Sequence, residues 1–206
     1  MLDFVLRQAE LTYGRTLSGV KILDMETLKE AITKLHEQYR IPHIMITSIS
    51  LPSPGAEPFL SVVGSTMTST ATPRIFGVKV PAIDCFFSGT GDMFAALMLV
   101  RLREAVFERE GLANKDAWVS EDDVDATDLP LARATEKVLA SMHDVLTKTK
   151  EKRDEEIEKY NTRVQGIGED DDKRFRLVQS KAAEVRLIRN LDALKNPVIK
   201  FRAERV

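Results

Sequence analysis

The chain has 206 residues, of which 43% are hydrophobic and 30% are charged, and its formal net charge is −2. Such values are typical of one globular domain, and the balanced charge gives no indication of nucleic-acid or membrane binding. The single cysteine, Cys85, excludes an internal disulfide and indicates a reducing compartment. We therefore expect a protein of the cytoplasm, with the nucleus as a second location. No apolar run approaches the ~20 residues of a membrane-spanning helix.

The first third of the chain predicts one helix and then strands. Asp24 is suited to cap a helix over residues 25–39, in which apolar residues recur at helical spacing. Residues 43–48 form a short apolar run typical of a buried strand. Residues 59–64 and 74–80 are β-branched and roughly alternating, so they predict an antiparallel pair at a sheet edge.

The middle of the chain predicts a central helix and a surface loop. Residues 90–110 are apolar nearly all round at first, which is typical of a helix in the centre of a domain. Residues 109–128 are polar and read as a loop that Trp118 anchors.

The last third predicts a second long helix over residues 129–162. Its part from Lys148 to Tyr160 is almost entirely charged, so we expect it to project into solvent. Residues 175–179 and 198–202 read as closing strands. The order of these elements predicts an α/β fold, part of a three-layer sandwich with a central, mostly parallel sheet, an antiparallel edge pair and flanking helices.

The segment that opens the central helix, Gly89-Thr90-Gly91-Asp92, is the strongest candidate for chemistry. A helix start offers free N–H groups and a positive dipole end, and glycines let an anion approach the backbone closely. Asp92 would repel a bound anion, but it is suited to take a proton from a hydroxyl that attacks a phosphate. The structural alternative is an ordinary helix start, with Gly for the bend, Thr as the cap and Asp for the dipole.

Thr47 and Ser48 stand at the end of the predicted strand 43–48, where ligands of open α/β sheets bind. They are either ordinary strand-end residues or contacts to nucleotide phosphates and a metal-bound water. In the second case Ile83, Asp84 and Cys85 would form part of an adenine wall, whereas the alternative for Cys85 is a small buried hydrophobe. The sequence shows no zinc-ligand spacing, no defensible Ser-His-Asp set and no Walker phosphate loop.

Four segments, in this order, resemble the pyridoxal kinase branch of the ribokinase-like small-molecule kinases. They are Leu17–Ile22 with Leu-Ser-Gly, Ile46–Pro54 with Thr-Ser and Leu-Pro-Ser-Pro, Gly89–Ala96 with Gly-Thr-Gly-Asp, and Phe175–Ser180 with Leu-Val-Gln-Ser. The resemblance covers residues 17–206 and is weaker over 109–172, which reads as a charged helical and loop expansion. Residues 1–16 do not match.

The resemblance implies transfer of the ATP γ-phosphate to the 5′-hydroxymethyl group of the vitamin B6 vitamers pyridoxal, pyridoxine or pyridoxamine. By position, Asp92 would be the catalytic base, and Gly89, Thr90 and Gly91 would form an anion hole around the transferring phosphoryl group. Thr90 would also contact ATP. Mg²⁺ or another divalent cation, a monovalent cation such as K⁺, and a homodimer are further implications.

The remaining ATP contacts implied by the resemblance come from two segments. Thr47 and Ser48 would lie at the ATP phosphates, with Thr47 reaching the cation site through water or a monovalent cation. Ile83, Asp84 and Cys85 would lie along the adenine.

The family's Asn-x-x-Glu motif, which precedes Leu-Ser-Gly and helps to organise the metal ion, is absent from residues 7–15. We therefore expect the chain to represent the C-terminal half of such a kinase, truncated at its N-terminal side, with impaired activity. One alternative is another ribokinase-like kinase, such as one acting on hydroxymethylpyrimidine, although Leu-Pro-Ser-Pro argues against it. A second is a catalytically inactive fragment that only binds nucleotide or partner chains.

Overall fold

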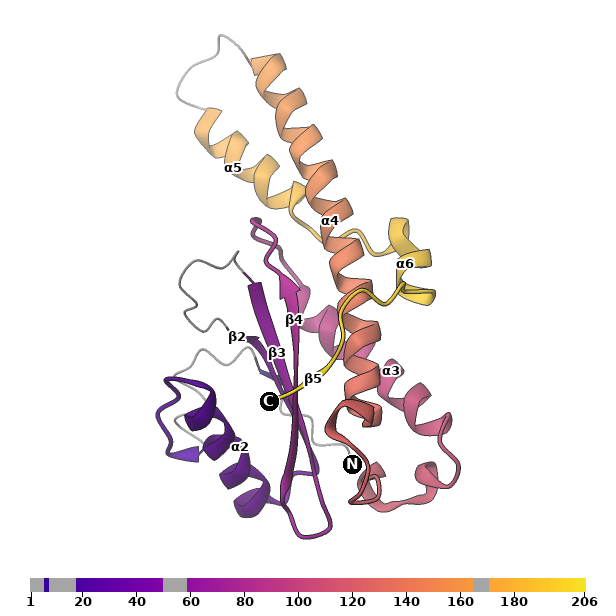
Figure 1. The fold of residues 1–206 in the computed structure, drawn as a ribbon. Coiled ribbons are helices and arrows are strands. Elements are labelled where there is room, and N and C mark those ends of the chain that lie inside the picture. Colours follow the sequence, from indigo (N-terminus) through magenta and orange to yellow (C-terminus); the bar gives the residue numbers. More distant parts are fainter. Residues whose placement is uncertain (1–5, 8–17, 50–58, 165–170) are drawn as a thin grey trace.

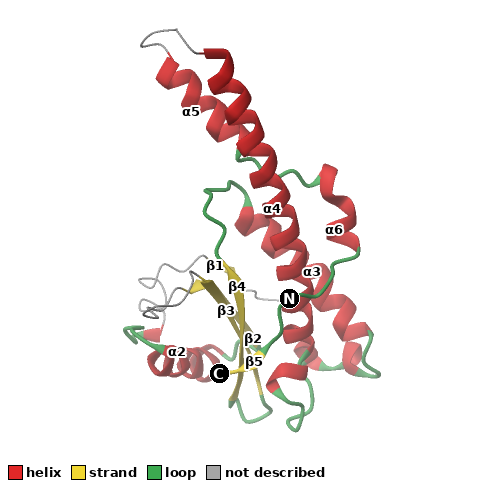
Figure 2. Ribbon diagram, turned by 45° about the horizontal axis from the view of Figure 1, so that its top comes forward, coloured by secondary structure: helices red, strands yellow, loops and turns green. Residues whose placement is uncertain are grey.

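The computed structural model describes residues 6–7, 18–49, 59–164 and 171–206. A five-stranded sheet separates α2 on one face from α3 and α4 on the other, as Figures 1 and 2 show. This arrangement confirms the expected α/β fold with flanking helices. The elements are β1 (Leu6–Arg7), α2 (Met25–Tyr39), β2 (His43–Ile49), β3 (Phe59–Met67), β4 (Pro73–Pro81), α3 (Thr90–Phe107), α4 (Pro130–Val164), α5 (Asp171–Ala182), α6 (Leu191–Lys195) and β5 (Glu204–Arg205), with short 3-10 turns at Leu112–Asn114, Asp116–Trp118, Ala126–Asp128 and Ile188–Asn190.

The expectation of a mostly parallel sheet is wrong for the described strands. Their order is β1-β2-β3-β4-β5, and of these pairs only β1–β2 is parallel. Only residues 50–58 connect β2 to β3, and only residues 68–72 connect β3 to β4. A parallel connection needs a crossover of a dozen or more residues, so these short links impose antiparallel pairing. The antiparallel pairing of β3 with β4 is confirmed, but β3 lies inside the sheet.

Two apolar cores hold the helices on the sheet. On one face, Leu28 and Ile32 of α2 are buried in the cluster that includes Val63 of β3. Asp24 starts this helix as expected, because its carboxylate accepts the Thr27 N–H at 2.9 Å. On the other face, Phe76 of β4 packs in one cluster with residues of α3 and α4. Trp118 packs against this second cluster, which agrees with its expected role as the anchor of the loop.

The loop that Trp118 anchors is tied to the sheet by two basic side chains. Arg74 of β4 donates to four carbonyl oxygens, three of them in the loop at Ser120, Glu121 and Val124. His43 of β2 is buried; its Nε2 donates to the Ala117 carbonyl at 2.8 Å and its Nδ1 accepts the Thr66 hydroxyl at 2.9 Å. Both nitrogens of His43 are thereby engaged in its neutral form.

The burial of His43 predicts that the protein is less stable in mild acid. Burial lowers the pKa of His43 from 6.5 to about 4, so between these values the unfolded chain binds the proton more readily. The stabilisation is complete above about pH 6.5 and is lost as the pH falls toward 4, by about 2–3 kcal/mol. Urea titrations between pH 4.5 and 7.5 measure this slope.

Variants separate this contribution from those of other histidines. His43→Asn should flatten the dependence of the unfolding free energy on pH, whereas His143→Asn should leave most of it, since His143 is only partly buried. A His43→Asn protein with the original pH slope would contradict the assignment. His36, whose pKa is also lowered by burial, contributes in the same direction.

Two segments expected to be strands are not strands. Residues 175–179 belong to α5, which lies beside the distal part of α4, with the rings of Tyr160 and Phe175 5.9 Å apart (Figure 1). A segment this short, with only three apolar residues, fits a helix or a strand equally, and packing on α4 decided here. None of the described helices is long and apolar enough to cross a membrane.

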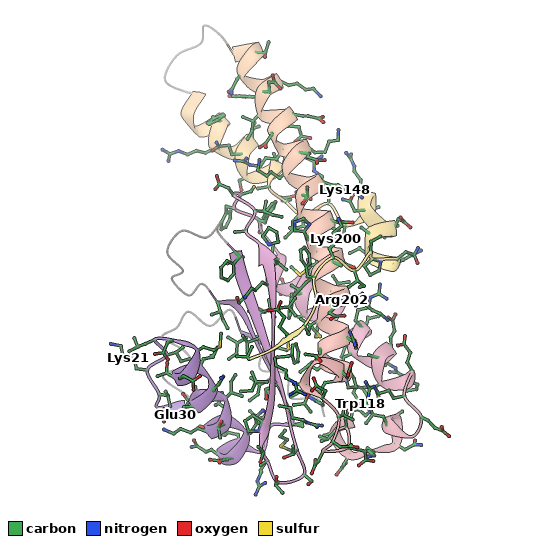
Figure 3. All side chains as sticks on the ribbon, in the orientation of Figure 1. Lys21, Glu30, Trp118, Lys148, Lys200 and Arg202 are labelled. Carbon is green, nitrogen blue, oxygen red and sulfur yellow. The ribbon has the colours of Figure 1, made fainter. Side chains whose placement is uncertain are left out.

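Residues 198–202 run along α4 without strand pairing, and Figure 3 shows Lys200 and Arg202 beside that helix. The buried Glu136 carboxylate accepts the Arg202 guanidinium at 3.0 Å and the Ala203 N–H at 2.9 Å. Lys200 pairs with Asp144 at 2.6 Å. Side chains of α4, rather than a neighbouring strand, therefore satisfy this segment, and only β5 reaches the sheet.

Candidate active site

The glycine turn, residues 88–92, joins the loop after β4 to α3. Gly89 has φ 85°, a left-handed conformation that favours glycine, and the first helical bond runs from the Met93 N–H to the Gly89 carbonyl. No side chain of the described residues caps this helix end. A Cβ at Gly89 or Gly91 would meet no atom within 4 Å. The turn therefore presents the backbone of a helix start to open space, as an anion site requires.

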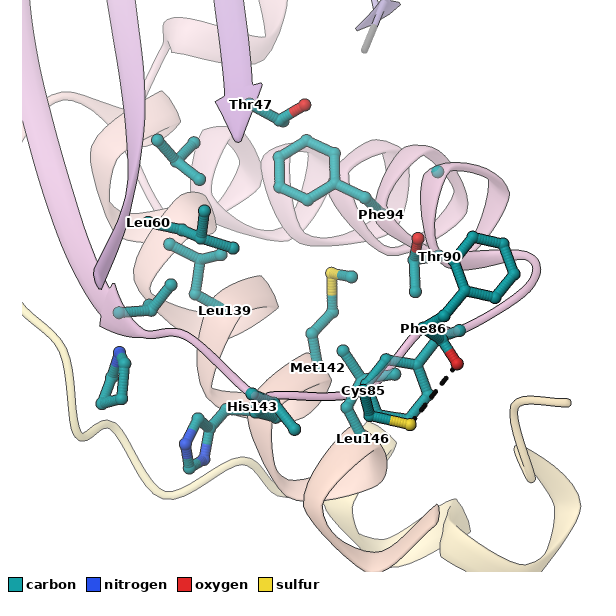
Figure 4. Close-up of a pocket in the computed structure, with 16 residues that line it drawn as sticks. Thr47, Leu60, Cys85, Phe86, Thr90, Phe94, Leu139, Met142, His143 and Leu146 are labelled. Carbon is teal, nitrogen blue, oxygen red and sulfur yellow. Dashed lines mark hydrogen bonds between the residues drawn. The ribbon is translucent and has the colours of Figure 1, made fainter. Parts of the chain in front are cut away.

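A pocket of about 290 Å³ lies beside the glycine turn, between the sheet and the helices α3 and α4 (Figure 4). Its walls are mostly apolar, and the hydroxyls of Thr47 and Thr90 are among its few polar groups. The lining residues are Thr47, Leu60, Val62, Val80, Pro81, Ile83, Cys85, Phe86, Phe87, Thr90, Gly91, Phe94, Leu139, Met142, His143 and Leu146.

Several of the predicted site residues meet in this pocket, although they come from distant segments. Thr47 at the end of β2, Ile83 and Cys85 after β4, and Thr90 and Gly91 at the start of α3 all line it. Cys85 is half-buried rather than enclosed in the core. Gly89, Asp84 and Asp92 are exposed and do not line the pocket, and the side chain of Ser48 lies outside the described residues.

Asp92 stands in the first turn of α3 with its side chain exposed. It directly follows Thr90 and Gly91, which line the pocket, but does not itself line it. Further along the helix, Leu99, Val100 and Phe107 are exposed by 52%, 54% and 60%. Leu99 and Val100 follow Asp92 by about two helical turns, and Phe107 follows it by about four. All three therefore lie on the face of α3 that carries Asp92.

Sequence reasoning missed the α4 side of the pocket. Leu139, Met142 and Leu146 recur at helical spacing within the long helix predicted over residues 129–162, a pattern that indicates a buried face. Periodicity identifies a buried face but does not show whether that face meets packed side chains or a pocket. The loop Pro52–Pro54, which carried part of the resemblance, lies outside the described residues. So do most of residues 1–16, which were expected not to match the family.

His143 is the one imidazole at the pocket among the described residues. Its ring contacts Phe201 edge-on with centroids 5.2 Å apart, and its buried Nδ1 has no hydrogen-bond partner in the described part of the chain. Burial lowers the pKa of His143, and the charge of Lys200 lowers it further. His143 is therefore neutral near pH 7 and offers a hydrogen-bonding edge rather than a charge.

The described residues contain no group of three or more His, Cys, Asp or Glu side chains that could hold a metal ion. Mg²⁺ in phosphoryl-transfer sites commonly needs only one or two protein oxygens, because substrate phosphates and water supply the rest. The hydroxyl of Thr47 and the carboxylate of Asp92 are oxygens of this kind. A cation held by such oxygens would take its remaining ligands from phosphate and water.

Sequence comparisons place the chain beside pyridoxal kinases, while no protein-family model matches it. A putative pyridoxal kinase of Schizosaccharomyces pombe is 32% identical over 133 residues, which are 65% of this chain and 38% of that protein. The pyridoxal kinase of Sus scrofa is 33% identical over 111 residues, 52% of this chain and 27% of that protein. The matched region is thus less than half the length of these curated relatives.

Solved structures show the same fold. The pyridoxal kinase of Leishmania donovani in complex with ADP has a TM-score of 0.58 and 18% identity, covering 94% of this chain and 49% of that one. The Plasmodium falciparum enzyme with AMP-PNP and PL has a TM-score of 0.56 and 17% identity, covering 95% and 47%. These findings confirm the resemblance that the four sequence segments indicated: the chain is similar in sequence and in fold to pyridoxal kinases, and it spans about half their length or less.

Proposed function

We propose that the chain supplies the ATP-binding and phosphoryl-transfer part of a kinase for pyridoxal, pyridoxine or pyridoxamine. The observation that carries the proposal is the juxtaposition of an apolar pocket with an uncapped helix start bearing Asp92. Phosphoryl transfer from a nucleotide needs an apolar pocket for the base beside an anion site and a carboxylate, and few other functions need all three. Relatives of this chain are named pyridoxal kinases, and one solved neighbour holds ADP together with pyridoxamine.

The pocket is suited to a nucleobase. Apolar walls exclude water from the faces of a purine ring, and a few polar groups fix its orientation. Ile83 and Cys85 form the loop-side wall, and Met142 and Leu146 form the α4 side. The proposed phosphate path leads from this pocket past Thr90 to the glycine turn, with Thr47 and Ser48 on the strand side. Asp84 would lie at the solvent edge of the adenine.

The glycine turn would act on charge that develops during transfer. The N–H groups of Thr90, Gly91 and Asp92 precede the first helical bond and would donate to the oxygens of the γ-phosphoryl group, with Gly89 allowing the close approach. Asp92 would accept the proton of the 5′-hydroxyl as that oxygen attacks phosphorus. Mg²⁺, when bound with the nucleotide, would neutralise negative charge on the phosphates. A monovalent cation such as K⁺ near Thr47, a homodimer and a cytoplasmic location remain predictions.

One observation favours a second candidate, a nucleotide-binding chain without catalysis of its own. The face of α3 that carries Asp92 also carries the exposed Leu99, Val100 and Phe107. Asp92 itself is also exposed, so the described residues do not enclose its carboxylate in an acceptor site. Nucleotide binding without turnover by the chain of residues 1–206 would support this candidate and the expected truncation together.

Filling the pocket should abolish nucleotide binding without unfolding the protein. Met142→Trp places an indole where the base would lie, so we expect at least about a tenfold loss in affinity for Mg·ADP. Isothermal titration calorimetry measures the affinity, and thermal unfolding checks the fold. Leu99→Trp is the matched control, since Leu99 is exposed on α3 and does not line the pocket. Equal affinity in both variants would place the nucleotide elsewhere.

A further inference from the structure

The charged distal part of α4 is not solvated on all sides. Thr149, at the start of this charged stretch, is fully buried, and its hydroxyl donates to the Val145 carbonyl at 2.8 Å. The same oxygen accepts the Arg186 N–H at 3.5 Å. One side of the distal helix therefore binds the backbone that follows α5.

This backbone, residues 182–186, is referred to as the return segment. Ala182 and Ala183 are buried at its start. At its end the Arg186 guanidinium pairs with the Glu156 carboxylate of α4 at 2.9 Å, and the Arg186 side chain is only 17% exposed. An ion pair between α4 and the return segment thus adds to the Thr149 contact.

The return segment also contacts the glycine turn. Glu184 and Ser88 form an isolated parallel β-bridge, and Ser88 immediately precedes Gly89. A continuous chain of contacts therefore runs from Glu156 through Arg186 and Glu184 to Ser88.

We propose that Arg186 is a positioning residue, whose ion pair with Glu156 holds the return segment against Ser88 and so orients the N–H groups of residues 90–92. The inference rests on the proposed function for its catalytic meaning, since these groups are the proposed anion hole. It also gives a role to the charged part of α4, which the resemblance to pyridoxal kinases covers least well. An anion hole works only when its donors are held in place before the charge develops.

The chain of contacts predicts local loosening rather than global unfolding when it is cut. A single partly exposed ion pair contributes little to overall stability. The β-bridge to Ser88 is isolated, so no neighbouring ladder bond replaces it. Loss of the ion pair should therefore affect the glycine turn far more than the thermal midpoint.

The test compares Arg186→Glu with the charge-exchanged double variant Glu156→Arg/Arg186→Glu. We expect Arg186→Glu to speed amide hydrogen exchange at the backbone of the Ser88–Glu184 bridge and to weaken Mg·ADP binding about tenfold, with little change in thermal midpoint. The exchanged pair should restore both quantities. Lys29→Glu is the matched control. It likewise replaces an ion pair, between Lys29 and Glu26, with a repulsion between two carboxylates, but on α2, on the opposite face of the sheet.

Hydrogen exchange at the Ser88–Glu184 bridge that is unchanged in Arg186→Glu, or that stays fast in the exchanged pair, would overturn the inference. A wild-type chain that does not bind Mg·ADP would instead count against the proposed function. The exchange measurement needs no nucleotide, so it still decides the positioning role in that case.

Discussion

Asp92→Asn is expected to remove phosphoryl transfer to pyridoxal while leaving nucleotide binding intact. The amide keeps the shape of the carboxylate but accepts no proton, so the loss should be about 10²–10⁴-fold in turnover. The side chain is exposed in the first turn of α3, so the substitution should leave the fold in place. Formation of pyridoxal phosphate from pyridoxal and Mg·ATP, followed by absorbance, measures turnover, and calorimetry with Mg·ADP measures binding.

The control for this variant is Glu110→Gln, which neutralises another exposed acidic side chain shortly after the same helix. Its turnover should equal that of the wild type. Full activity in Asp92→Asn would refute the role of this residue as the base. Binding of Mg·ADP without turnover in the wild-type chain would select the non-catalytic candidate instead.

Gly64→Ala is expected to destabilise the protein by about 3 kcal/mol, a large effect for one methyl group. Gly64 lies in β3 between Met45 of β2 and Phe76 of β4 in the register of the sheet. A Cβ there would overlap the Phe76 ring and stand 2.8 Å from the Met45 Sδ. Phe76 is fully buried, so its ring has no free space into which to move. Urea unfolding measures the change.

A second substitution tests whether the Phe76 ring causes the loss. Phe76→Leu alone should also destabilise, by leaving a cavity. The double variant should be clearly more stable than the sum of the two losses predicts, because the added methyl group fills part of that cavity. Strict additivity would show that the cost of Gly64→Ala arises elsewhere, for instance from backbone conformation.

The sequence predicted best those features that depend on local patterns. The α2 helix, with its cap at Asp24, and the β3–β4 pair follow from apolar spacing and capping chemistry, which act over a few residues. The prediction of a strand at residues 175–179 was wrong, because the pattern of so short a segment is compatible with either a helix or a strand. Packing on α4 selected the helix there, and that contact is not encoded within the run itself.

By itself, the sequence determined the α/β class, the glycine turn with Asp92 as the candidate base, and the relationship to pyridoxal kinases. Only the tertiary structure decided which other residues join that turn, because Thr47, Cys85 and Met142 stand far apart in the chain and meet through the packing of sheet and helices. It likewise decided the antiparallel pairing of β2 with β3 and the contact of Glu184 with Ser88. Such contacts depend on how distant segments satisfy one another's backbone groups and apolar faces, and no local pattern specifies this.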